Sequence, residues 1–328
     1  MSEANGVAAG GRRPIVLDTD PGIDDALAIL YLAAAPEVEI VAVGAAPGNL
    51  PTAMAADNAL RLLDLVGLTD VPVALGAHTP LSQPPAISRA HGEDGLGGAA
   101  GPPSARRPVA HSAAEQLVGL ARRRPGELTV VALGPLTNLA LALLLERDLP
   151  RLLRAVVWMG GAIHRAGNRT PHAEFNAWQD PEAAELVLAA GFDLTMVPLD
   201  VTETARADRA WVAAVAASAD PRARFASRML EHFVDFYATT LGIEGCLLHD
   251  PLAAAVAATP ALATTCEERE VTVELTGTHT RGMLVTDLRP TIHPCGYARR
   301  PVRVVVEADV SRLLDRLRHA LVGAALPA

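Results

Sequence analysis

The stretch Ile15-Val-Leu-Asp18-Thr-Asp20-Pro-Gly22-Ile-Asp24-Asp25-Ala-Leu-Ala-Ile-Leu30 decides the fold, and it places four carboxylates within eight residues. Its apolar start is typical of a buried strand, whereas Pro21 and Gly22 favour a sharp turn. The apolar spacing after Asp24 predicts the inner face of a helix. The carboxylates are therefore expected where a strand ends and the next helix begins.

These aspartates have no positive charge near them in the sequence, because no Lys or Arg lies between Arg13 and Arg61. Carboxylates this close repel one another unless a cation lies among them. The hard cations Ca²⁺ and Mg²⁺ prefer such oxygen ligands. An EF-hand is excluded, since counting from Asp18 the sixth position is Ile23 rather than Gly and the twelfth is Ile29 rather than Glu.

The composition of the 328-residue chain excludes several classes of protein. A net charge of −9 argues against a nucleic-acid partner, and the absence of Lys excludes Schiff-base and P-loop lysines. No apolar stretch is long enough for a membrane helix. Three widely spaced cysteines, Cys246, Cys266 and Cys295, fit a reducing cytosol and favour a cytoplasmic protein. Residues 1–12 are polar and small, and we expect a disordered tail there.

Strand-like and helix-like segments alternate along the chain, which is typical of a mostly parallel sheet flanked by helices. Strands are expected at 15–17, 38–43, 71–75, 128–133, 155–159 and 194–199, and extended segments near the C-terminus at 271–275, 283–286 and 302–306. Helices are expected at 51–66, 111–123 and over most of 205–241, and a long loop at 77–110. Residues 13–328 are thus predicted to form one α/β domain whose ligands bind beyond the carboxyl ends of the strands.

The motifs of several catalytic classes are absent, among them GxSxG, HExxH and the dinucleotide fingerprint GxGxxG. Water activated by a metal and a carboxylate is the nucleophile that remains. Asn168, Glu174 and Asn176 suit hydroxyl recognition, although a capped surface loop explains them equally well. His91 and His249 are candidate proton donors. The alternative interpretation is that they are simply exposed to solvent. Asp250 is a candidate metal ligand from a distant part of the chain. The alternative interpretation is that it simply caps the N-terminus of a helix.

Taken together, ordered motifs along nearly the whole chain resemble the inosine-uridine-preferring nucleoside hydrolases. The motifs lie at 18–25, 47–49, 91–93, 134–138, 158–161, 167–171, 174–176, 180–184, 249–251 and 280–283. The resemblance implies a nucleoside hydrolase-like fold with a Rossmann-like core. It also implies hydrolysis of the N-glycosidic bond of ribonucleosides, by a calcium-bound water that an aspartate activates.

The resemblance further implies a role for each site residue. Ca²⁺ would be held by the carboxylates of Asp20, Asp25 and Asp250 and by the main-chain carbonyl of Leu133. Asp20 would also be the general base. The remaining substrate contacts are Asp24, Asn49 and Asn176 at the ribose, Asn168 and Glu174 at the 5′-hydroxyl, Met159 at the sugar, and His91, Tyr237 and His249 at the base. Asn49 would also orient the water, and His249 would assist departure of the base.

Base preference depends on a few of these positions. His249 matches the histidine of one subgroup, which favours inosine, uridine or pyrimidine nucleosides. Phe233 and Leu241 stand where some members carry Tyr and Arg, which predicts a more apolar base end. An extra residue between Met159 and Asn168 is expected to reshape the loop near the 5′-hydroxyl. Asp18 has no assigned contact, and we expect it to support the cluster from behind.

Two other functions stay open at this stage. A haloacid-dehalogenase-like phosphatase also begins with a strand and Asp-x-Asp, but it normally continues with Gly-Thr rather than Pro21-Gly22. A calcium-dependent nucleoside-binding protein without turnover would keep the same fold. The resemblance implies a homodimer or homotetramer.

Overall fold

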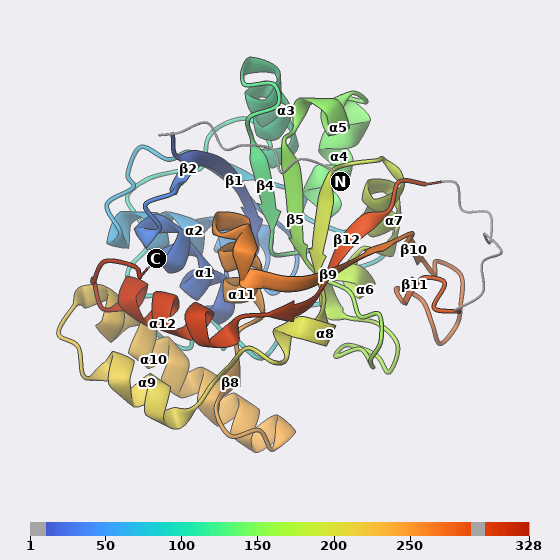
Figure 1. Ribbon diagram of the computed structural model, residues 1–328. Coiled ribbons are helices and arrows are strands. Elements are labelled where there is room, and N and C mark those ends of the chain that lie inside the picture. The colour runs from blue at the N-terminus through green and yellow to red at the C-terminus, as the bar shows by residue number, and fades with distance from the viewer. Residues whose placement is uncertain (1–10, 290–298, 328) are drawn as a thin grey trace.

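The computed structural model describes residues 11–289 and 299–327. Its centre is an eight-stranded sheet in the order β3-β2-β1-β4-β5-β6-β12-β9 (Figure 1). The strands are β1 (Arg13–Thr19), β2 (Val38–Ala45), β3 (Val73–Leu75), β4 (Thr129–Ala132), β5 (Ala155–Met159), β6 (Leu194–Val197), β9 (Ala263–Arg269) and β12 (Val302–Ala308). Neighbouring strands are parallel except β12 and β9, which are antiparallel. The predicted mostly parallel sheet is confirmed.

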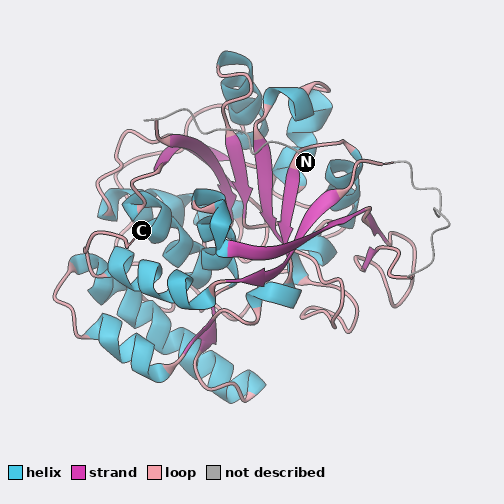
Figure 2. Ribbon diagram, viewed as in Figure 1, coloured by secondary structure: helices cyan, strands magenta, loops and turns pink. Residues whose placement is uncertain are grey.

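Helices cover both faces of the sheet, as Figure 2 shows. One face packs against α1 (Ile23–Ala34), α2 (Thr52–Leu65) and α11 (His249–Ala258), and α10 (Pro221–Phe236) and α12 (Val310–Leu321) pack on the outside of these helices. The other face packs against α3 (Ala113–Arg123), α4 (Thr137–Leu145) and α7 (Pro181–Ala189). Because successive strand residues point to opposite faces, Ile15 and Leu17 join the first core and Val16 joins the second. This explains why β1 is apolar throughout its start.

The remaining elements are short and connect the sheet to its covering helices. They are α5 (Leu149–Leu152), α6 (Phe175–Gln179), α8 (Leu199–Thr202), α9 (Arg209–Ala216), the π-helical turn Tyr237–Leu241, the 3₁₀ turn Pro260–Leu262, and the strand pairs β7 (Arg206–Ala207) with β8 (Cys246–Leu247) and β10 (Thr272–Val273) with β11 (Leu284–Val285). No helix in the described ranges is long and apolar enough to cross a membrane.

Strand β9 is the main element that the sequence pattern did not predict. Its residues Ala-Thr-Thr-Cys-Glu-Glu-Arg are mostly exposed and show no apolar alternation. An edge strand needs only backbone pairing on one side, which here comes from β12. Residues 1–10 of the predicted tail and Cys295 lie outside the described residues.

The order of the strands reverses at β1, since β2 and β3 lie on one side of it and β4, β5 and β6 on the other. Such a switch point opens a ligand site beyond the carboxyl ends of the strands. The chain places Asp20 just after β1, Asn49 after β2, Leu133 after β4 and Met159 at the end of β5. Candidate residues from distant parts of the sequence are therefore gathered at one edge of the sheet.

Candidate metal and substrate site

Three buried carboxylates form the centre of the site. Asp24 and Asp25 lie in the first turn of α1, and Asp250 lies in the first turn of α11. One ligand oxygen from each lies within 4.8 Å of the others, which is a suitable arrangement for sharing one metal ion. Helices α1 and α11 pack together, so the two ends that carry these aspartates meet. The sequence prediction placed Asp24 at the ribose, whereas the structure includes it in this carboxylate group.

Asp20 lies beside this group and is completely buried. Its Oδ2 accepts a hydrogen bond from the Asn49 main-chain N–H, while its Oδ1 has no hydrogen-bond partner among the described residues. Gly134 packs against the same carboxylate, and a Cβ at that position would lie 2.6 Å from Asp20 Oδ1. The carboxylate is thus held from one side and keeps one oxygen free of hydrogen bonds.

Asp25 is the best-anchored carboxylate of the site. Its Oδ1 accepts from the Thr19 hydroxyl, and its Oδ2 accepts from the Gly22 main-chain N–H at 3.0 Å. The Asn49 side-chain amide also donates to Oδ2, at 3.3 Å. Asn49 therefore contacts Asp20 through its main chain and Asp25 through its side chain, which places the two predicted metal ligands next to each other.

The electrostatics of the cluster favour a cation. Burial, reinforced by repulsion from Asp25, raises the pKa of Asp24 to about 8. Burial and neighbouring carboxylates also raise the pKa of Asp20 and Asp250 well above the ordinary range. Asp20 Oδ1 and Asp24 Oδ1 are buried without any hydrogen-bond partner in the described chain. Carboxylate oxygens that are buried without a hydrogen-bond donor fit a hard divalent cation.

The amide of Asn176 joins the ends of two strands. Its Nδ2 donates to the Leu133 carbonyl at 2.8 Å and to the Met159 carbonyl at 3.0 Å. Its Oδ1 accepts no hydrogen bond within the described residues, which leaves this oxygen for a ligand hydroxyl. Leu133 is therefore at the site, and its carbonyl is already engaged by one donor.

Glu174 and Asn168 differ in how they are placed. Glu174 is buried and caps α6, because its carboxylate accepts from the main-chain N–H groups of Asn176 and Ala177. It also accepts from Gly161 N at 2.8 Å, which fixes the loop after β5. Asn168 is exposed, and its Oδ1 accepts from Phe175 N at 2.9 Å. Both side chains thus hold this loop through hydrogen bonds to its main chain.

An aromatic group lies beside the carboxylates. His91 Nδ1 lies 3.9 Å from Asp24 Oδ1, and the His91 ring lies 5.5 Å from the ring of Phe233. Phe233 in turn contacts Tyr237 edge-on, with ring centroids 4.9 Å apart. The Tyr237 hydroxyl lies 3.4 Å from His249 Nε2. The structure therefore brings His91, Tyr237 and His249 together, whereas Leu241 is 56% exposed at the end of the π-helical turn.

Both histidines are neutral at physiological pH. Burial, with repulsion from His232 and His249, lowers the pKa of His91 to about 3. Burial, with repulsion from Arg165, lowers the pKa of His249 to about 4. Neutral imidazoles can donate one hydrogen bond each without adding positive charge next to a metal site.

Several residues of the site were missed by the sequence analysis. The Thr202 hydroxyl contacts His249, the Thr19 hydroxyl contacts Asp25, and Gly22, Gly48 and Gly134 leave room for site side chains. Thr and Gly are common in every turn, so only their position relative to distant residues reveals a role. In the sequence only Gly22 lies beside the aspartates, where it indicates a turn, and Gly48 and Gly134 lie far from them.

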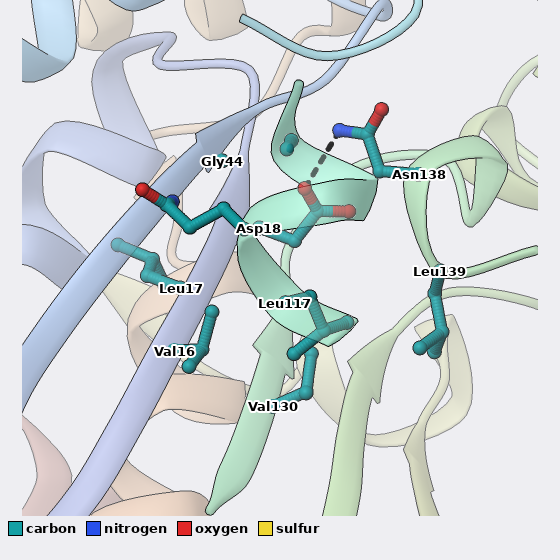
Figure 3. Close-up of a pocket in the computed structure, with 10 residues that line it drawn as sticks. Val16, Leu17, Asp18, Gly44, Leu117, Val130, Asn138 and Leu139 are labelled. Carbon is teal, nitrogen blue, oxygen red and sulfur yellow. Dashed lines mark hydrogen bonds between the residues drawn. The ribbon is translucent and has the colours of Figure 1, made fainter. Parts of the chain in front are cut away.

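Asp18 lines a small pocket between β1 and α3, together with Gly44 and Asn138 (Figure 3). Its Oδ1 accepts from Asn138 Nδ2 at 2.8 Å, and its Oδ2 has no partner among the described residues. The Asn138 amide also binds Ala45 O and Ala77 N, so it joins β1, β2 and the loop after β3. Burial raises the pKa of Asp18 to about 7.

Comparison with known proteins agrees with this geometry. Residues 15–315 match the family described as "Inosine-uridine preferring nucleoside hydrolase". The chain is 38% identical over 324 residues to "Probable uridine nucleosidase 2" of Arabidopsis thaliana, covering 96% of this chain and 100% of that protein. It is 41% identical over 276 residues to "Pyrimidine-specific ribonucleoside hydrolase RihA" of Enterobacter sp. (strain 638), covering 84% and 88%. The solved structure "Plant nucleoside hydrolase - PpNRh1 enzyme" superposes with a TM-score of 0.90 at 31% identity, covering 97% of this chain and 100% of that one.

The sheet is mostly parallel and carries a buried carboxylate site at its carboxyl edge. The whole fold matches a solved nucleoside hydrolase over nearly its full length, so the class of protein is a nucleoside hydrolase. The chain belongs to the inosine-uridine preferring nucleoside hydrolase family. It hydrolyses the N-glycosidic bond of ribonucleosides, and the phosphatase alternative is wrong.

Proposed function

We propose that this protein is a Ca²⁺-dependent hydrolase that prefers pyrimidine ribonucleosides, with uridine as the first substrate to test. The observation that carries the proposal is the buried group Asp24, Asp25 and Asp250, with Asp20 beside it and no basic residue among them. Two neutral histidines adjoin this group. Such a site combines oxygen ligands for a hard cation with uncharged hydrogen-bond donors.

Asp20, Asp25 and Asp250 would hold the cation, together with the Leu133 carbonyl, and Asp24 lies close enough to share it. A bound Ca²⁺ supplies the positive charge that the cluster lacks, and it makes a nearby water more acidic. Asp20 Oδ1 is the candidate acceptor for the proton of that water, because it has no hydrogen-bond partner among the described residues. The Asn49 N–H holds the other oxygen of the same carboxylate.

Cleavage of an N-glycosidic bond develops positive charge on the ribose, as in an oxocarbenium ion. Carboxylate and amide oxygens that face the ribose would stabilise this charge. Asp24 Oδ1 has no hydrogen-bond partner among the described residues and would accept a ribose hydroxyl, as would Asn176 Oδ1. Met159, the last residue of β5, contacts the Asn176 amide through its sulfur. Asn168 and Glu174 remain our prediction for the 5′-hydroxyl, with the loop around them already anchored to Gly161.

The preference for pyrimidines is supported by two relatives. Both the uridine nucleosidase and the pyrimidine-specific hydrolase named above carry that preference in their names, and they cover most of this chain. His91, Tyr237 and His249 would meet the base, and Phe233 lies between two of these rings. An aromatic wall with a few donors suits a flat ring with carbonyl groups.

The test is release of ribose from uridine, cytidine, inosine, guanosine and adenosine, before and after removal of metal with a strong chelator. We expect uridine to be cleaved fastest and activity to return on addition of Ca²⁺. Asp20→Asn should lower kcat by several orders of magnitude while circular dichroism stays unchanged. Purine cleavage that exceeds uridine cleavage would overturn the preference, and activity that survives chelation would overturn the metal requirement.

We also propose a homodimer or homotetramer, as the family resemblance implies. The exposed leucines Leu144 and Leu145 on α4 and Leu186 on the adjoining α7 are consistent with a covered surface. Sedimentation equilibrium measures the assembly directly, and a monomer at micromolar concentration would contradict this proposal.

A further inference from the structure

A buried hydroxyl contacts the histidine that would meet the leaving base. Thr202 ends helix α8, which directly follows β6, and its side chain is completely buried. Its Oγ1 lies 2.7 Å from His249 Nδ1, at the start of α11. Helices α8 and α11 pack against each other, so this contact joins two elements that are far apart in the sequence.

The direction of this hydrogen bond follows from the partners available. A neutral imidazole carries one proton, on either Nδ1 or Nε2. Among the described residues the Thr202 hydroxyl has no partner other than His249 Nδ1. A buried hydroxyl without an acceptor costs about 1–3 kcal/mol. The other ring nitrogen, Nε2, lies 3.4 Å from the Tyr237 hydroxyl, which is longer than a normal hydrogen bond, so the 2.7 Å contact with Thr202 decides the tautomer. The Thr202 hydroxyl therefore donates to Nδ1, and the imidazole proton lies on Nε2, where the Tyr237 oxygen can accept it.

The second histidine of the site is held in the same way. His91 Nδ1 accepts from the main-chain N–H of Ile23, at 3.1 Å. A main-chain N–H can only donate, so His91 also carries its proton on Nε2. Both imidazoles are thus fixed through Nδ1 by a donor of the fold, and each keeps its proton on Nε2. The Nε2 atom of His249 has only the long contact of 3.4 Å with the Tyr237 hydroxyl among the described residues, so its proton can pass to a closer acceptor.

We propose that Thr202 is a positioning residue, which fixes the proton of His249 on Nε2 so that this atom donates a hydrogen bond to the departing base. This inference rests on the proposed role of His249. When the bond between ribose and a pyrimidine breaks, its electron pair goes to the base, and negative charge spreads to the base carbonyl. A hydrogen-bond donor at Nε2 stabilises that charge, whereas a lone pair at Nε2 would repel it.

The experiment compares two substrates that differ in their leaving group. Uridine needs hydrogen bonding to its departing base, whereas 4-nitrophenyl β-D-ribofuranoside releases a stable nitrophenolate without such help. We expect Thr202→Val to lower kcat/KM for uridine by about 100-fold, as expected for loss of a group that orients a donor. The same variant should change kcat/KM for the nitrophenyl riboside less than about threefold.

Three controls complete the design. Thr202→Ser keeps the hydroxyl and should restore most of the uridine activity. Thr204→Val removes a nearby hydroxyl whose one partner among the described residues is the Val201 carbonyl, and it should leave both activities unchanged. In the His249→Ala background, Thr202→Val should cause no further loss on uridine, because the two residues act as one unit.

The outcomes separate this inference from the proposed function. Equal losses on both substrates, or no loss on uridine, would overturn the role of Thr202 while wild-type turnover still supports the function. A wild-type protein that cleaves neither substrate with Ca²⁺ present would instead contradict the proposed function itself.

Discussion

Gly48 lies so close to Asp20 that a Cβ atom at position 48 would come within 2.0 Å of Asp20 Oδ2. The φ angle of Gly48 is not in the left-handed region, so the backbone itself would accept an alanine. The glycine is required by the neighbouring carboxylate rather than by the turn. Gly134 contacts the same carboxylate at its other oxygen, because a Cβ at position 134 would lie 2.6 Å from Asp20 Oδ1.

We therefore predict that Gly48→Ala displaces the Asp20 carboxylate and lowers kcat for uridine by about 100-fold, the usual effect of a misplacement of about 1 Å. Steady-state kinetics measures this loss. Gly119→Ala is the matched control, because a Cβ there meets only the flexible end of Arg123 within helix α3. The control should keep full activity and gain up to about 1 kcal/mol of stability. Wild-type kcat in the Gly48 variant would contradict the prediction.

Asp18 and Asp20 should respond very differently to the same substitution. Asp18→Asn keeps an oxygen to accept the Asn138 amide and removes a carboxylate whose second oxygen has no partner in the described chain. We expect it to retain kcat within about tenfold and to lose no thermal stability at alkaline pH. Asp20→Asn should lose several orders of magnitude in kcat. Similar losses in both variants would show that Asp18 takes part in the reaction.

The metal-free protein should lose stability as the pH rises. The pKa of Asp24 is raised to about 8 and that of Asp18 to about 7, both by burial. In the unfolded chain both groups are ionised above about pH 5, so the folded state binds more protons and its stability falls as pH rises through the folded pKa values. We expect a melting temperature in chelator that decreases between about pH 5 and pH 8 and levels off at higher pH.

Calcium should reverse this dependence. Because the carboxylates must be deprotonated to bind a cation, stabilisation by added Ca²⁺ should grow over the same pH range. Differential scanning fluorimetry with and without Ca²⁺ measures both trends. A melting temperature in chelator that is flat or rises with pH would contradict the burial of unpaired carboxylates.

Substitution of Gly22 by alanine should displace His91 and leave the metal site unchanged. A Cβ at position 22 would lie 2.7 Å from His91 Nδ1, the atom that accepts from the Ile23 N–H. The φ of −84° at Gly22 permits alanine, so Gly22→Ala should displace only the imidazole. We expect kcat/KM for uridine to fall about tenfold or more. In a His91→Ala background the second substitution should add no further loss.

Isothermal titration calorimetry supplies the control for this variant. Ca²⁺ affinity should stay within about threefold of wild type, since Asp25 keeps its bond from the Gly22 main chain. A large loss of Ca²⁺ affinity would show instead that the variant disturbs the carboxylate group.

Much of the fold could be predicted from local patterns. The apolar run before Asp18 and the Pro-Gly turn after Asp20 are short-range signals, and they correctly placed β1 and the start of α1. The exposed edge strand β9 carries no such signal, because its only requirement is the backbone of β12. The order of the strands is equally invisible in local sequence, since it depends on which strands pair after the chain has crossed the sheet.

The sequence by itself predicted a cation among the aspartates at positions 18–25, because charge repulsion depends on their proximity along the chain. In the structure Asp18 is bound by Asn138 instead. The family resemblance implied that Asp250 joins Asp25, but only the tertiary structure places Asp24 in the same group, since this requires helix α11 to pack beside α1. The contact between Thr202 and His249 has the same origin. Local conformational preferences depend on a few neighbouring residues. A catalytic site forms where the ends of distant elements meet, and the packing of the whole sheet and its helices determines which ends those are.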